Sequence, residues 1–95
     1  MNNLMTQEEL DKIIALHKQW LKDESTGERA GIADKNISGL IFKDCCLDGA
    51  VFLRTNLTKC KFNNVDLSNC QFIKTNFYVR FNFMTYFIFH FIPPN

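Results

Sequence analysis

The chain has 95 residues, so we expect one domain with a small core. Its 11 basic and 10 acidic residues give a net charge of +1, which excludes a general electrostatic attraction to nucleic acid or to anionic lipid. It has four cysteines and starts without a secretory signal, which predicts free thiols in a reducing compartment, the cytoplasm.

Residues 1–29 are predicted to form a capping helix and a linker. Thr6 and Glu9 have the spacing of a capping box, which begins a helix, and Gly27 is a typical stop. Residues at helical spacing form one apolar face, which we expect to cover the first coil of the segment that follows. The members of this face are Leu10, Ile13, Ile14, His17, Trp20 and Leu21.

In residues 30–79 a large apolar residue returns at every fifth position without a gap. These central residues are Ile32, Ile37, Phe42, Leu47, Phe52, Leu57, Phe62, Leu67, Phe72 and Phe77. Among the residues two places before them, only Lys35 is charged. A helix repeats about every 3.6 residues and a strand every 2, so neither explains this period.

A period of five requires a turn in every repeat. In an extended chain a central residue and the residue two places before it point to the same side. The next inward pair would then point to the wrong side unless the chain turned once per repeat. Repeated turns of one hand wind the chain into a solenoid with an apolar interior, whose successive coils pair through backbone hydrogen bonds.

The pattern resembles the pentapeptide-repeat family, whose repeat is roughly A-[DN]-[LF]-x-x. The best local matches are TNLTK (55–59), VDLSN (65–69) and TNFYV (75–79). The resemblance implies a mainly β fold, a short right-handed quadrilateral β-helix with four repeats per coil and about two and a half coils. The alternation of Phe and Leu from Phe42 to Phe72 agrees with four walls, because Phe then stacks on Phe and Leu on Leu. Gly31 and Lys35 depart from the family pattern, so the first coil is irregular or Lys35 reaches solvent.

Residues 80–95 are predicted to be an aromatic, non-repeat tail that does not continue the coil, because the next central position holds Asn82. Alternating Phe residues in this tail indicate a strand, which Pro93 and Pro94 end. Its apolar run is short for a membrane span, which takes about 20 residues.

Three interpretations of the tail remain open. It is a cap or dimer strand over the open last coil, an interfacial membrane contact, or the product of a shifted reading frame in an AT-rich gene. The first interpretation includes a homodimer through the C-terminal end. The candidate interface residues are Phe77, Phe81, Phe83, Phe87 and Phe89.

No catalytic, cofactor or metal site is predicted. The chain has no Gly-rich phosphate loop, no C-x-x-C pair and no interpretable spacing of Ser, His and an acid. In a four-walled coil Cys60 and Cys70 lie on opposite walls, and the cysteines are expected to act as small apolar residues. His17 is expected to pack within the helix face.

These patterns favour a non-catalytic domain that acts through its outer surface on an unknown protein partner. The candidate contact residues are Asn36, Lys43, Asp44, Arg54, Asn56, Lys61, Asp66 and Asn76.

Two alternatives remain. Some pentapeptide-repeat proteins mimic DNA and bind type II topoisomerases, which needs a long acidic rod. Residues 30–79 instead have six basic and four acidic side chains, in a stack about 12 Å tall against roughly 34 Å for a turn of DNA. The other alternative is a truncated or frameshifted fragment without activity of its own.

Overall fold

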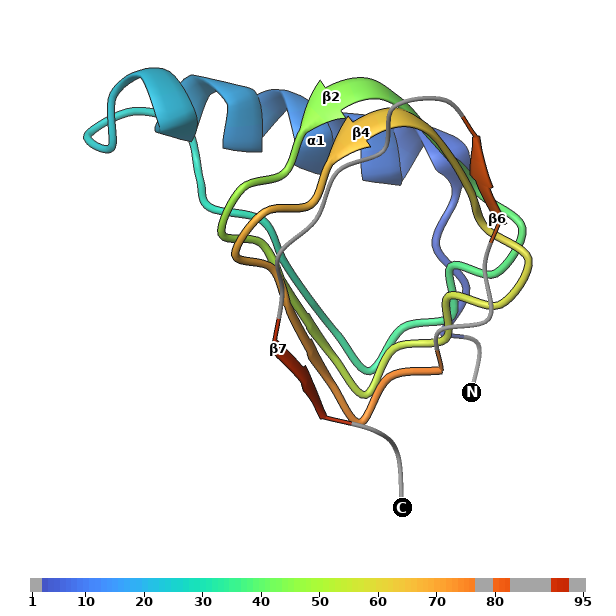
Figure 1. The fold of residues 1–95 in the computed structure, drawn as a ribbon. Coiled ribbons are helices and arrows are strands. Elements are labelled where there is room, and N and C mark those ends of the chain that lie inside the picture. Colours follow the sequence, from blue (N-terminus) through green and yellow to red (C-terminus); the bar gives the residue numbers. More distant parts are fainter. Residues whose placement is uncertain (1–2, 77–79, 83–89, 93–95) are drawn as a thin grey trace.

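The computed structural model describes residues 3–76, 80–82 and 90–92, the last two segments through their backbone (Figure 1). Its helix α1 spans Gln7–Lys22. The predicted capping box is confirmed: the Thr6 hydroxyl accepts from the Glu9 amide at 3.1 Å, and the Glu9 carboxylate accepts from the Thr6 amide at 2.9 Å. These hydrogen bonds lower the pKa of Glu9.

The helix ends at Lys22, earlier than the predicted stop at Gly27. Gly27 has a φ of +65°, and a Cβ there would clash with the Leu16 carbonyl oxygen. This glycine therefore lets the linker fold back closely against the helix instead of ending it.

The rest of the described chain is built from short strands. They are β1 (Gly31–Ala33), β2 (Ile41–Cys46), β3 (Val51–Leu53), β4 (Lys61–Asp66), β5 (Gln71–Ile73), β6 (Arg80–Asn82) and β7 (His90–Ile92). All pairs are parallel, in one sheet of order β1-β3-β5-β7 and another of order β2-β4-β6. The chain is thus mainly strand with one N-terminal helix, and Figure 1 shows successive passes of the chain lying over one another.

The register of the strands agrees with four repeats per circuit. Phe42 pairs with Phe62, and Phe52 pairs with Phe72. The rings of the first pair stack with centroids 4.4 Å apart, and those of the second meet edge to face at 5.0 Å. Since each pair spans four repeats of five residues, the expected contact of Phe62 with Phe42 is confirmed.

The inward assignment of the central residues is confirmed over the described repeats. Every central residue from Ile32 to Phe72 is at most 3% exposed. The residues two places earlier are buried from Ala50 onward, whereas Lys35 is exposed to solvent as its charge requires. The hydroxyl group of Thr55, which is buried, donates to the Ile32 carbonyl at 3.1 Å.

The turn that each repeat requires lies two residues after its central residue. The residues at these corners are Asp34, Gly39, Asp44, Gly49, Arg54, Lys59, Asn64, Asn69 and Lys74, all with φ between +47° and +84°. This left-handed backbone redirects the chain at each corner. It costs a non-glycine residue roughly 1–2 kcal/mol, so the sequence accepts strain at most corners.

The tail differs from its prediction. Strand β6 pairs Phe81 with Phe62, and β7 pairs Phe91 with Phe72, so both extend the existing sheets. The expectation that residues 80–95 leave the coil is wrong for these two segments. Paired residues are one position closer in the sequence here than in the earlier passes. The omitted position lies after Asn76, because Asn76 still pairs with Asn56. Counting in unbroken fives from Phe77 therefore placed Asn82 where Phe81 belongs.

Candidate interaction surface

Alternation within each short strand places side chains on the outside of the repeats. The residues beside each buried central residue point outward. On strands β1, β3 and β5 of the four-stranded sheet β1-β3-β5-β7, these outward residues form what we term the uncharged face, because none of them has an ionisable group. Its members are Gly31, Ala33, Val51, Leu53, Gln71 and Ile73.

The uncharged face has a regular layout. Its residues form two columns. One column contains Gly31, Val51 and Gln71, and the other contains Ala33, Leu53 and Ile73. The larger aliphatic side chains of this face are half-buried by their neighbours and still reach solvent. In Figure 1 this sheet lies on a different side of the molecule from α1, so the helix does not cover it.

One edge of the uncharged face is a corner column of charged residues, Asp34, Arg54 and Lys74. The Arg54 guanidinium binds Asp34 through two hydrogen bonds of 2.6 and 3.0 Å. This pair is about half exposed, with 53% and 58% of the two side chains accessible, and it lowers the pKa of Asp34. A polar hollow of about 330 Å³ lies beside the column and is lined in part by Lys35 and Lys74.

The outer surface of the other sheet mixes polar and charged residues with the exposed Ile41. Lys43 and Lys61 are exposed on the sheet β2-β4, whereas Asp48 and Asp66 lie further along the same passes. The Cys46 thiol donates to the Asp66 carboxylate at 3.7 Å. Asp44 is exposed next to Lys43, so basic and acidic groups are mixed on this sheet.

Several predicted contact residues use their side chains locally. Asn36, Asn56 and Asp66 each accept from the backbone amide two residues further on. The Asp44 carboxylate accepts from the side-chain amide of Asn64 at 3.0 Å. These oxygens stabilise the turns, so they are less available to a partner than the sequence suggested. Asn76 continues the backbone pairing of Asn36 and Asn56, and Lys43, Arg54 and Lys61 reach solvent.

The apolar face of α1 is buried at its centre. Leu10 and His17 are fully buried, and α1 contacts β2. His17 accepts from the Ala30 amide at Nδ1 (2.8 Å) and donates from Nε2 to the Asp48 carbonyl oxygen (2.9 Å). Burial lowers the pKa of His17, so its ring stays neutral. These two hydrogen bonds engage both ring nitrogens. Leu21 is 38% exposed, because the end of α1 extends past the sheet (Figure 1).

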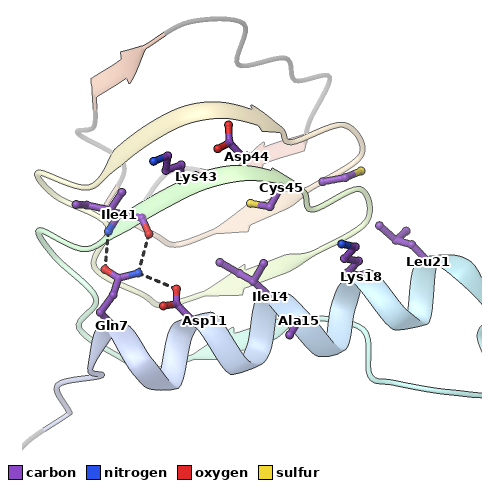
Figure 2. Close-up of a pocket in the computed structure, with 11 residues that line it drawn as sticks. Gln7, Asp11, Ile14, Ala15, Lys18, Leu21, Ile41, Lys43, Asp44 and Cys45 are labelled. Atoms are coloured by element: carbon purple, nitrogen blue, oxygen red, sulfur yellow. Dashed lines mark hydrogen bonds between the residues drawn. The ribbon is translucent and has the colours of Figure 1, made fainter.

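A groove of about 530 Å³ lies between α1 and β2 (Figure 2). At one end the Gln7 side-chain amide donates to the Ile41 carbonyl oxygen at 2.7 Å and accepts from the Ile41 amide at 2.9 Å. The groove is lined by Ile14 and Cys45 and also by two lysines and two aspartates, so its formal charges balance.

The thiols are unpaired, and two of them are buried. All four cysteines are free, as expected, and Cys60 and Cys70 are buried. Their thiols donate to the carbonyl oxygens of Ile37 and Leu47 at 3.0 Å. Burial raises the pKa of Cys60 to about 11 and that of Cys70 to about 12, so both stay protonated at neutral pH. Within the described residues, no group of three His, Cys, Asp or Glu side chains could hold a metal ion.

The predicted C-terminal interface falls largely outside the described part of the chain. Phe81 lies in β6, with its backbone paired to Phe62. The other members, Phe77, Phe83, Phe87 and Phe89, lie outside the described residues. In the part of the chain that the structure describes, no helix is long and apolar enough to cross a membrane.

The sequence reasoning missed the uncharged face. The signal was present, because the outward residues of every fourth repeat from Ile32 onward lack charge. It is visible only when outward residues are grouped by wall rather than read along the chain.

Comparison of the chain with curated proteins and with solved structures found no match in either group. The family model for pentapeptide repeats matches residues 42–72 and 50–78, with eight copies of the repeat. These matches cover the part of the chain in which buried central residues and strained corners recur every five residues. Residues 42–78 of the chain therefore contain pentapeptide repeats.

Proposed function

We propose that this chain is a non-catalytic pentapeptide-repeat domain that binds another protein through the uncharged face. The observation that carries the proposal is the absence of any ionisable group among the outward residues of β1, β3 and β5. Val51, Leu53 and Ile73 place aliphatic side chains on the outward side of this sheet, where they are half-buried and still reach solvent. Contiguous apolar surface with a polar rim is typical of protein–protein contacts.

The proposal takes the fold to be the family's right-handed quadrilateral β-helix. Two features support it: residues pair across four repeats, and a left-handed corner recurs in each repeat. Such a scaffold is rigid, so it presents outward side chains at fixed positions about 4.8 Å apart along the stack. A rigid face loses little conformational freedom on binding, which favours recognition.

Two observations support a binding role over catalysis. The buried His17 uses both ring nitrogens inside the protein, and the buried thiols are held protonated. The free thiols also support a reducing compartment such as the cytoplasm.

Photo-crosslinking tests the binding role. A photo-reactive aromatic amino acid replaces Leu53 on the uncharged face or, as a matched control, Lys61 on the other sheet, in the full chain expressed in its own organism. We expect an adduct of one defined mass from position 53 and none of that mass from position 61. The absence of an adduct at position 53, or the same adducts from both positions, contradicts the proposal.

A further inference from the structure

We propose that the partner of the uncharged face is a second copy of this chain, packed face to face about a two-fold axis parallel to the strands. This inference rests on the proposed function and names its partner. The axis reverses the order of the strands, so β1 of one copy lies against β5 of the other. Each column of outward residues in one copy then lies opposite the equivalent column of the other copy.

Shape supports this arrangement, because the uncharged face is tapered. Its side chains increase in size from β1 (Gly31 and Ala33) to β5 (Gln71 and Ile73). Reversal of the strand order places the smallest side chains of one copy against the largest of the other. Leu53 on the middle strand then meets its own counterpart at the axis. A patch that fits its own reverse is what a two-fold interface requires.

Charge supports the same axis. The corner column runs from acidic to basic, with Asp34 beside β1, Arg54 beside β3 and Lys74 beside β5. Reversal places Asp34 opposite Lys74 of the second copy, and symmetry makes this contact twice. Arg54 meets Arg54 near the axis, but each guanidinium is bound to Asp34 of its own chain.

The other two-fold arrangement, with the axis along the stack, is less favourable. It would place this corner column opposite the column at the other edge of the face, where Arg29 binds the Gly49 carbonyl oxygen at 2.6 Å. It would also keep β1 opposite β1 and β5 opposite β5, so the smallest side chains of the two copies would face one another and the largest would meet, and the two faces would not fit closely.

The face is small, so the dimer is expected to be weak. Interfaces that bury less than about 1,200 Å² are generally transient. We therefore expect a reversible equilibrium between monomer and dimer over protein concentrations from about 10 μM to about 1 mM.

Sedimentation equilibrium on the full chain tests the inference. Leu53→Lys places two like charges at the axis and should weaken the dimer at least about tenfold. Lys43→Asp, on the other sheet, is the control and should leave the equilibrium unchanged. Circular dichroism of each variant confirms that it is folded.

A charge exchange sharpens the test. Asp34→Lys should weaken the dimer, because a cation then faces Lys74 of the second copy. The double variant Asp34→Lys with Lys74→Asp restores opposite charges across the interface and should regain most of the association. A merely structural role of Asp34 would give no such recovery specific to dimerisation.

Three outcomes overturn the inference. These are a monomer up to about 1 mM, self-association that Leu53→Lys does not change, and failure of the charge exchange to restore association. A monomer together with a crosslinked adduct of another mass at position 53 rejects the second copy and leaves the proposed function standing. A monomer without any adduct at that position rejects both.

Discussion

The inward and outward positions of the repeat obey different rules. Inward, the central residues from Ile32 to Phe72 are all large, apolar and buried. Outward, the same backbone has an uncharged face on one sheet and lysines on the other. The inward residues are set by packing, because the interior accepts only side chains that are apolar or hydrogen-bonded. The outward residues are free to differ, so recognition is expressed there.

The largest expected effect is the difference in stability between substitutions at two neighbouring residues of β4. Phe62 is fully buried and stacked on Phe42, so Phe62→Ala should lower the free energy of unfolding by about 3–5 kcal/mol. Lys61→Ala, at an exposed position of the same strand, should change it by less than about 0.5 kcal/mol. Thermal melts followed by circular dichroism measure both, and equal melting temperatures would refute the inward assignment of Phe62.

The next effect concerns His17 in the lid. His17→Phe leaves the buried Ala30 amide without its acceptor and should cost about 1–3 kcal/mol. The wild-type chain should also lose stability as the pH falls below about 6.5. The reason is that burial lowers the pKa of His17 in the folded state, so the unfolded chain takes up the proton first.

Denaturant unfolding at pH 7.5 and pH 5.5 measures this dependence, which should be smaller in His17→Phe. An equal loss of stability in the variant would assign the pH dependence to other groups.

A smaller effect tests the corners. Gly39 has a φ of +78° and open space where a Cβ would lie, so Gly39→Ala should cost about 1 kcal/mol through backbone strain alone. Lys59, one pass further on, has a φ of +64°, and Lys59→Gly should stabilise the chain by a similar or smaller amount. Chemical denaturation measures both, and the same sign for the two changes would contradict the strain argument.

The last prediction concerns DNA mimicry, for which we expect no measurable effect. The outer surface mixes basic and acidic residues, as in the Arg54–Asp34 pair, so it lacks the continuous negative charge of DNA. We expect no inhibition of gyrase supercoiling by the chain at micromolar concentration. Inhibition that weakens with added salt would instead support DNA mimicry.

Much of the fold follows from the sequence because its cause is local. The period of five identifies the buried residues, and Thr6 with Glu9 identifies the start of α1. The tail was harder, because the omission of one residue after Asn76 changes the count without any mark in the sequence. A count restarted at Phe81 would have reached Phe91 after two repeats, in agreement with β6 and β7.

The candidate site was less predictable. The uncharged face becomes visible only when residues four repeats apart are known to be neighbours, and that number came from the family resemblance. The role of Gln7 was also hidden, because its two hydrogen bonds with Ile41 join positions far apart in the sequence.

Gln7 has a consequence for assembly. Its amide gives β2 the donor and acceptor that another strand would supply, and the backbone of Asn3 and Met5 does the same for Asn36. A head-to-tail fibre of parallel strands needs an open edge at each end of every copy. Because these contacts occupy the backbone of Ile41 and Asn36 at the N-terminal end, a strand added there would have to displace them, which opposes end-to-end polymerisation from that side.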